Sequence, residues 1–292
     1  MQIGIFGRTI SEGRKESVKA LYQSLFNKGA SLHIYEPFCK KSKALIPDGA
    51  SVSTFTSHQN FANTCSLLIT IGGDGTLLEG ITFIKNSEVP ILGINTGRLG
   101  FLTGFSNEEI DIAAEMAVEQ TFSIDKRTLL QVITDPDPFN EFPFALNEAT
   151  IHKTDSSSMI TLMVKRNGAP LNTYWADGLI ISTATGSTGY SLSCGGPIML
   201  PESANFIVTP IAPHNLNVRP LVISDEDELS IKMEVRGKEV MLSVDSRSAS
   251  ISAKQTITIK KAPFPVRLVR KPDQDFLKTL REKLMWGNDK RN

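Results

Sequence analysis

The chain has 292 residues, of which 40% are hydrophobic and 21% are charged. This length suits one or two domains of ordinary size, and the apolar content excludes a disordered chain. The 31 basic and 31 acidic side chains cancel, so no net charge steers the protein toward nucleic acid or an anionic membrane. We therefore expect a globular protein without a nucleic-acid or membrane partner, in which any anionic ligand is held locally.

The cysteines and the start of the chain indicate the compartment. Cys39, Cys65 and Cys194 are scattered and form no C-x-x-C pair, which predicts neither a disulfide framework nor a cysteine zinc site. The opening MQIGIFGR lacks the basic and apolar regions of a secretory signal. The uncharged stretch 178–201 is crowded with Ser, Thr, Gly and Pro, which indicates a loop-rich site and not a membrane span. We expect a cytoplasmic protein.

The first part of the chain alternates strand and helix signals. Residues 3–6 form a short apolar run, after which Val18, Leu21 and Leu25 recur at helical spacing. Further strands are predicted at 32–35, 67–71 and 90–94, and helices at 76–85 and 108–120. Ser106 and Glu109 have the spacing of a capping box for the last helix. Strands separated by helices predict a doubly wound, Rossmann-like α/β domain with a parallel sheet.

The pattern changes after about residue 121. Apolar, β-branched runs without a helix between them lie at 130–134, 160–164, 179–182, 206–209, 229–233, 240–244 and 257–260. Turn signals such as Asn167-Gly168 separate several of them, which predicts an antiparallel β-sandwich. Pro272-Asp273 then predicts the start of an amphipathic helix that returns to the first domain. We expect an N-terminal α/β domain of residues 1–122 and 264–292, and a C-terminal β-sandwich of residues 123–263.

The first candidate site is a glycine turn at the end of the buried run 67–71. It reads Gly72-Gly73-Asp74-Gly75-Thr76 and leads into a predicted helix. A glycine turn at a helix N-terminus presents free N–H groups that suit phosphate. A carboxylate there would repel phosphate, so Asp74 is predicted to orient a hydroxyl or accept its proton. The alternative is a simple turn with Thr76 as N-cap, and the short pattern leaves both open.

Three further stretches are candidates. Residues 95–103 follow the next strand at the sheet edge where ligands bind, or they form a glycine-rich connection with Phe101 in the core. Asn147 and Glu148 can hold sugar hydroxyls or an amino group, or they form a solvated strand end. The loop 177–197 contains many hydroxyls, and a buried hydroxyl without a partner costs about 1–3 kcal/mol. We therefore predict that this loop needs a polar ligand.

These motifs, in this order and over most of the chain, resemble the NAD kinase family. The glycine-aspartate motif alone is shared with diacylglycerol and sphingosine kinases and, more distantly, phosphofructokinases, whereas the hydroxyl-rich loop from Asp177 to Ser191 is far more specific. The resemblance implies that ATP, with a divalent metal ion such as Mg or Mn, phosphorylates the 2′-hydroxyl of the adenosine ribose of NAD to give NADP. It also implies a homodimer or a homotetramer.

The resemblance also implies roles for individual residues. Asp74 would be the proton acceptor, Gly75 would approach the nucleotide through its backbone, and Phe101 would line the pocket. Gly72, Gly73 and Thr76 would complete the phosphate loop. Further NAD contacts are implied at Asn147, Glu148, Asp177, Thr185, Thr188, Gly189, Tyr190, Ser191, Leu192, Ser193 and Ala212. Because a ribose hydroxyl is a very weak acid, we expect its proton to leave late, with most of the catalysis coming from positioning and charge neutralisation.

Some positions depart from the usual family pattern. Gly189 stands where Ala is common, Trp175 where a basic residue is frequent, and Asp245-Ser246-Arg247 where Asp-Gly-Gln is common.

Two other functions stay open. One is a soluble lipid kinase, which would need an apolar acyl pocket. The other is a dinucleotide-sensing module without catalysis, in which Asp74 only hydrogen-bonds a ribose. Metal chemistry through histidine is not expected, because His33, His58, His152 and His214 show no ligand spacing.

Overall fold

The chain divides into two compact units, and each is described by itself. The first unit comprises residues 1–126 and 266–292, and the second comprises residues 127–265. The structure is a computed structural model that describes residues 1–97, 100–139, 142–154, 158–272 and 275–285. None of the helices within these residues has both the length and the apolar character that crossing a bilayer requires.

The first unit is built on a seven-stranded sheet with the order β3-β2-β1-β4-β5-β19-β6. Its strands are β1 (Gln2–Phe6), β2 (Ser31–Tyr35), β3 (Val52–Phe55), β4 (Leu67–Ile71), β5 (Ile91–Ile94), β6 (Ser123–Arg127) and β19 (Val266–Arg270). β1 pairs in parallel with β2 and β4, and β5 pairs in parallel with β4 and β19. The carboxyl ends of these strands therefore meet at one edge, where the loops after β4 and β5 lie.

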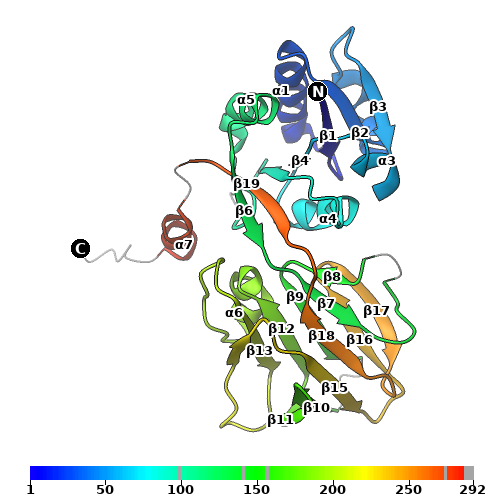
Figure 1. Cartoon of the computed structure of the whole chain (residues 1–292), viewed down its shortest axis with the longest axis vertical. Helices are drawn as coiled ribbons and strands as arrows, with labels where there is room; N and C mark the ends of the chain where they lie inside the picture. The colour runs from blue at the N-terminus through cyan, green and yellow to red at the C-terminus, as the bar shows by residue number, and fades with distance from the viewer. Residues whose placement is uncertain (98–99, 140–141, 155–157, 273–274, 286–292) are drawn as a thin grey trace, which may run out of the picture. The chain divides into compact units, whose positions relative to one another are not determined.

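Helices cover both faces of this sheet, with α1 and α5 on one face and α3 and α4 on the other (Figure 1). The helices are α1 (Glu12–Asn27), α2 (Glu36–Ser42), α3 (His58–Ala62), α4 (Asp74–Ile84), α5 (Ile110–Glu119) and α7 (Phe276–Leu284), with short 3-10 turns η1 (Lys43–Leu45) and η2 (Asn107–Glu109). Alternate side chains of β1 and β4, such as Ile5 and Ile69, pack with α1 and α5 in one apolar core. The predicted doubly wound domain is confirmed.

Two helix signals of the sequence are confirmed. The capping box is present, because the Ser106 and Glu109 side chains each accept a backbone N–H of the other residue. The amphipathic C-terminal helix is present as α7, which begins at Phe276, and the Asp275 side chain accepts the Leu277 N–H at 2.9 Å. Asp273 of the Pro272-Asp273 start signal lies outside the described residues.

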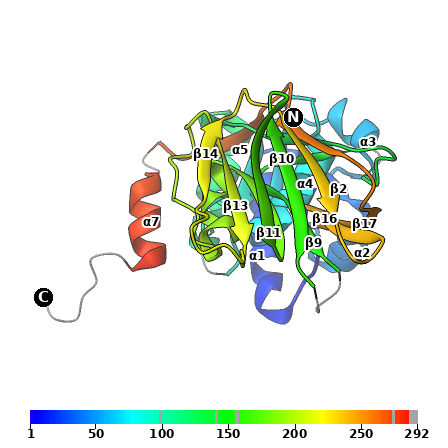
Figure 2. The same cartoon turned by 90° about the horizontal axis from the view of Figure 1, so that it is seen from below.

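The second unit contains two antiparallel six-stranded sheets, with the orders β11-β10-β15-β18-β7-β8 and β14-β13-β12-β9-β16-β17. Its strands are β7 (Leu130–Ile133), β8 (Phe144–Ala145), β9 (Glu148–Lys153), β10 (Ile160–Arg166), β11 (Ala169–Ala176), β12 (Gly178–Thr183), β13 (Asn205–Ile211), β14 (Leu221–Ser224), β15 (Leu229–Glu234), β16 (Glu239–Val244), β17 (Arg247–Ser252) and β18 (Ile257–Lys261). β14 lies beside β13, and β11 lies beside β10 (Figure 2). Side chains from both sheets form one apolar core, so the predicted sandwich is confirmed.

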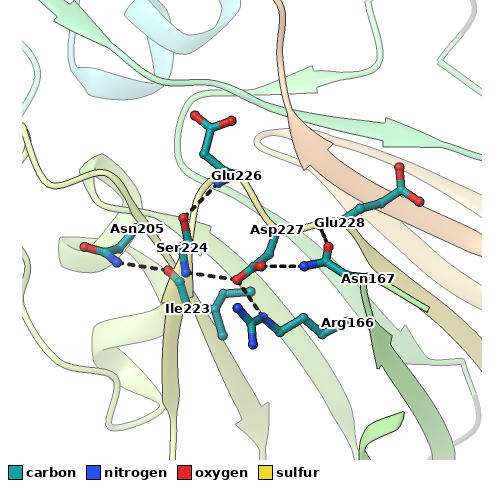
Figure 3. A network of polar contacts seen from close by, with 8 residues as sticks. All are labelled: Arg166, Asn167, Asn205, Ile223, Ser224, Glu226, Asp227 and Glu228. Carbon is teal, nitrogen blue, oxygen red and sulfur yellow. Dashed lines mark hydrogen bonds and ion pairs between the residues drawn. The ribbon is translucent and has the colours of Figure 1, made fainter. Parts of the chain in front are cut away.

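A polar network joins two turns of the second unit (Figure 3). The Asp227 side chain, whose residue is only 4% exposed, lies 2.7 Å from Arg166 Nε and accepts the Asn167 Nδ2–H at 2.8 Å. It also accepts the Ser224 backbone N–H at 3.1 Å. Arg166 ends β10 and Asn167 follows it in the turn to β11, whereas Ser224 ends β14 and Asp227 lies in the turn to β15. The buried carboxylate therefore fastens the two turns together.

Candidate functional site

The glycine turn after β4 leaves a helix N-terminus open to an anion. All five residues of β4 are buried, and α4 begins at Asp74 with Gly73 as its N-cap. A side chain at Gly72 would place its Cβ 2.3 Å from Thr76 Oγ1, so glycine is required there. A Cβ at Gly73 or Gly75 would meet nothing within 4 Å. Free N–H groups and open space at a helix N-terminus suit a phosphate group.

The Asp74 carboxylate is fixed by the loop that follows β5. Its Oδ1 accepts the Thr103 backbone N–H at 3.1 Å and the Thr103 hydroxyl at 2.9 Å. Its Oδ2 accepts the Phe101 backbone N–H at 2.8 Å. A carboxylate has about four lone-pair positions for hydrogen bonds. Asp74 is thus held in one orientation and still has an acceptor position on Oδ2.

The 95–103 loop is itself arranged around Asp74. The Thr103 hydroxyl accepts hydrogen bonds from Asn95 Nδ2 at 2.9 Å and from the Gly100 backbone N–H at 3.2 Å, which directs its own proton to Asp74. A Cβ at Gly100 would lie 1.8 Å from Asp74 Oδ1. The Phe101 ring is part-buried, and its centroid lies 6.3 Å from that of Phe276 in α7. Arg98 and Leu99, which belong to the same predicted stretch, lie outside the described residues.

Two arginines that the sequence analysis missed line a pocket at the glycine turn. The pocket has a volume of about 260 Å³, and Arg8, Thr9 and Arg14 line it together with Gly73, Gly75, Ile71 and Thr76. Arg8 Nε lies 2.5 Å from Glu79 Oε2 of α4. Both arginines follow β1 in the chain, and β1 lies next to β4 in the sheet. The adjacency of these two strands was the signal that could have pointed to the arginines. The pocket offers positive charge beside the open helix N-terminus.

A preformed metal cage is not part of this arrangement. Within the described ranges, no group of three or more His, Cys, Asp or Glu side chains could hold a metal ion. Mg²⁺ commonly keeps several waters and binds through substrate phosphates and one or two carboxylates.

In the second unit, the loop after β12 packs against Asn147 and Glu148. The Asn147 carbonyl accepts the Thr183 backbone N–H at 2.9 Å. A Cβ at Gly186 would lie 2.1 Å from that same carbonyl oxygen, and a Cβ at Gly189 would lie 2.9 Å from Glu148 Oε2. The structure thus brings the Asn-Glu pair and the hydroxyl-rich loop together, and glycines allow the close approach.

Glu148 lines a pocket and has a strongly perturbed carboxyl. Its Oε2 is buried and has no hydrogen-bond partner among the described residues. Burial, and then the negative charge of Asp245, raise the pKa of Glu148 to about 7, although the nearby backbone of Tyr190 opposes this shift. A pocket of about 500 Å³ opens here, lined by Glu148, Thr150, His152, Lys153, Thr154, Tyr190, Met241, Ser243 and Asp245. An unpartnered polar atom beside a pocket points to a polar ligand.

Asp177 and Ala212 lie together at one end of β12 and β13. The Asp177 backbone N–H donates to the Ile211 carbonyl at 2.9 Å, and Asp177 Oδ1 lies 2.6 Å from Lys153 Nζ. Ala212 has a φ of 43° and is exposed. Alanine at positive φ is strained, and such residues are concentrated at functional sites.

The prediction that the hydroxyl-rich loop needs a ligand is wrong for its buried members. The Ser191 hydroxyl is hydrogen-bonded to the Thr209 hydroxyl at 2.8 Å. The Ser187 hydroxyl accepts the Met199 N–H at 3.0 Å, and the Thr185 hydroxyl accepts a hydrogen bond from Arg127 Nη1 at 3.0 Å. These groups stabilise the loop from inside. Of the other predicted contacts, Thr188, Gly189 and Leu192 are half-buried, Ser193 is exposed and Tyr190 is 41% exposed.

The α/β unit with its glycine-aspartate loop, followed by the β-sandwich unit, defines a kinase of two domains. Models of the ATP-NAD kinase N-terminal domain and of the ATP-NAD kinase C-terminal domain match residues 3–122 and 146–271. The chain belongs to the ATP-NAD kinase family, and the predicted resemblance is confirmed.

Full-length relatives and solved structures agree with this assignment. The NAD kinase of Flavobacterium psychrophilum is 44% identical over 100% of both chains. The NAD kinase from Archaeoglobus fulgidus, solved in complex with ATP, is 26% identical, has a TM-score of 0.76, and is matched over 98% of this chain and 99% of that chain. Yeast NADH kinase, solved in complex with NADH, shares the fold with a TM-score of 0.89 at 24% identity, over 99% of this chain and 89% of that chain.

Proposed function

We propose that the protein is an NAD kinase that transfers the terminal phosphoryl group of ATP to the 2′-hydroxyl of the adenosine ribose of NAD, giving NADP. Asp74 accepts the proton of that hydroxyl. The supporting observation is the Asp74 carboxylate itself, which three donors hold at the glycine turn while Oδ2 keeps a free acceptor position. A carboxylate fixed in this way needs no reorientation when a hydroxyl is presented to it.

The glycine turn and its arginines would bind the phosphates of ATP. Gly72, Gly73, Gly75 and Thr76 provide the open helix N-terminus, and the adjacent pocket adds the charges of Arg8 and Arg14. Helix N-termini and guanidinium groups both stabilise the negative charge of a transferring phosphoryl group. A divalent metal ion, Mg or Mn, would arrive with ATP and neutralise phosphate charge.

The second unit would bind NAD. The proposed contacts are Asn147, Glu148, Asp177, Thr185, Thr188, Gly189, Tyr190, Ser191, Leu192, Ser193 and Ala212, together with Phe101 and Gly75 of the first unit. The unpartnered Glu148 Oε2 and the exposed Tyr190 ring support this assignment, because both line one pocket. Thr185 and Ser191 would contribute through their backbone, since their side chains are hydrogen-bonded within the unit.

The cellular form of the enzyme also belongs to this proposal. The resemblance to the family implies a homodimer or a homotetramer, and the three scattered cysteines without a C-x-x-C pair favour the reducing cytoplasm. Light scattering on the purified protein measures the number of subunits, and cell fractionation measures the location.

The variant Asp74→Asn tests the proposed role of the carboxylate. It should bind NAD in calorimetry but form NADP from ATP and NAD about 10²–10⁴-fold more slowly than the wild type, which is the usual contribution of a general base. Asp111→Asn is a matched control, because Asp111 is exposed on α5 and its loss should leave turnover unchanged. Near-normal turnover of Asp74→Asn would contradict the assigned role.

A further inference from the structure

The turn between β16 and β17 holds the backbone of the Asn147-Glu148 pair. Asp245 Oδ2 accepts the Leu146 N–H at 2.8 Å, and Oδ1 accepts the Asn147 N–H at 2.8 Å and the Glu148 N–H at 3.2 Å. The Asp245 N–H in turn donates to the Glu148 carbonyl at 3.0 Å. One carboxylate therefore binds three successive N–H groups at the point where β9 begins.

Arg247 binds the carbonyl groups of the same segment. Its guanidinium donates to the Phe142 carbonyl and, at 2.6 Å, to the Phe144 carbonyl. Its Cζ lies 5.2 Å from the centroid of the Phe142 ring and 5.8 Å from that of Phe139. The long, planar guanidinium side chain can bind two carbonyls and stack on aromatic rings at once.

The two neighbouring carboxyls differ in their hydrogen-bond partners. Burial raises the pKa of Asp245, although its three N–H donors and the charge of Arg247 oppose this shift. Both oxygens of Asp245 accept backbone N–H groups, whereas Glu148 Oε2 has no hydrogen-bond partner among the described residues. Asp245 is therefore occupied by the backbone, and Glu148 Oε2 is left for the pocket.

We propose that Asp245 is a positioning residue that, together with Arg247, fixes Asn147 and Glu148 in the NAD-binding pocket. This role rests on the proposed function, because it assumes that the pair contacts NAD. The titratable groups that line the pocket with Glu148 are His152, Lys153, Tyr190 and Asp245. Lys153 is paired with Asp177, and Asp245 is the neighbouring charge that acts on Glu148.

Asp245→Asn and Asp227→Asn form a matched pair for the test. Both aspartates accept backbone N–H groups and lie near an arginine, but Asp227 does not line the pocket. Steady-state kinetics of the full chain with ATP and NAD, from pH 6 to 9, should show that Asp245→Asn raises KM for NAD about tenfold and changes kcat less. The midpoint of its KM-against-pH profile should move to lower pH. Asp227→Asn should lower the unfolding temperature without either effect.

Each outcome decides the inference. Equal behaviour of the two aspartate variants, or an unmoved pH midpoint in Asp245→Asn, would overturn it. If Asp245→Asn does not fold, Arg247→Gln should raise KM for NAD about threefold, and an unchanged KM would overturn the role. A wild-type protein that forms no NADP would refute the proposed function and this role with it. If the wild type turns over normally and Asp245→Asn changes neither KM for NAD nor the pH midpoint, the positioning role alone is refuted.

Discussion

Glu148→Gln tests the charge state of the pocket carboxyl through protein stability. The pKa of Glu148 is raised from 4.5 to about 7 by burial and by Asp245. The folded state thus binds this proton more tightly than the unfolded state, so the wild type loses stability as the pH rises from 4.5 to 7. One pKa unit corresponds to about 1.4 kcal/mol, which makes the complete loss about 3 kcal/mol. Glutamine has nearly the shape of the protonated acid and cannot ionise.

Urea unfolding of the wild type and the variant between pH 5 and pH 8 measures this loss. We expect the free energy of unfolding of the wild type to fall by about 2.5 kcal/mol relative to that of Glu148→Gln, because part of the ionisation penalty is already present at pH 5. Glu202→Gln, at an exposed position after the short helix α6 (Tyr190–Ser193), is the control and should show a constant difference from the wild type. A constant difference for Glu148→Gln as well would show that Glu148 ionises as in water, and the electrostatic argument would be wrong.

Three further substitutions test the close contacts of the two loops. Gly100→Ala would place a Cβ 1.8 Å from Asp74 Oδ1, so the carboxylate must move. We expect kcat to fall at least about tenfold and the Kd for NAD, measured by calorimetry, to change less. Thr103→Val removes the hydroxyl donor to Asp74 and should lower kcat about tenfold, whereas Thr103→Ser should retain most of it in the same assay. Gly189→Ala would place a Cβ 2.9 Å from Glu148 Oε2 and should raise KM for NAD a few-fold. An unchanged KM would show that the Glu148 side chain can move aside without weakening NAD binding.

The parts of the fold that could be predicted are those with local signals. β4 and α4 were recognisable because an apolar run leads directly into glycines, and the capping box because Ser106 and Glu109 are three positions apart. β3 and β17 carry no such signal, since most of their side chains are exposed or half-buried. They become strands because neighbouring strands satisfy their backbone hydrogen bonds, and pairing of that kind depends on residues far along the chain.

The candidate site divides in the same way. Asp74 could be singled out because its glycine motif is contiguous, but its partner Thr103 lies 29 positions away. Asp245 and Leu146 are 99 positions apart, and only the register of β16 on β9 brings them together. The loop prediction failed for the opposite reason: the hydroxyls were visible in the sequence, whereas their partners Arg127 and Thr209 were not.

The position of β19 has a consequence for biosynthesis. This strand separates β5 from β6 in the first sheet, yet it follows the entire second unit in the chain. A ribosome delivers the N-terminus first, so residues 127–265 emerge before β19 does. At that stage the second unit has all the strands of its two sheets, whereas the sheet of the first unit still lacks the interior strand β19. The later-made unit can therefore fold to completion first. A nascent chain released anywhere within it would leave β5 as an uncovered edge, open to pairing with another chain.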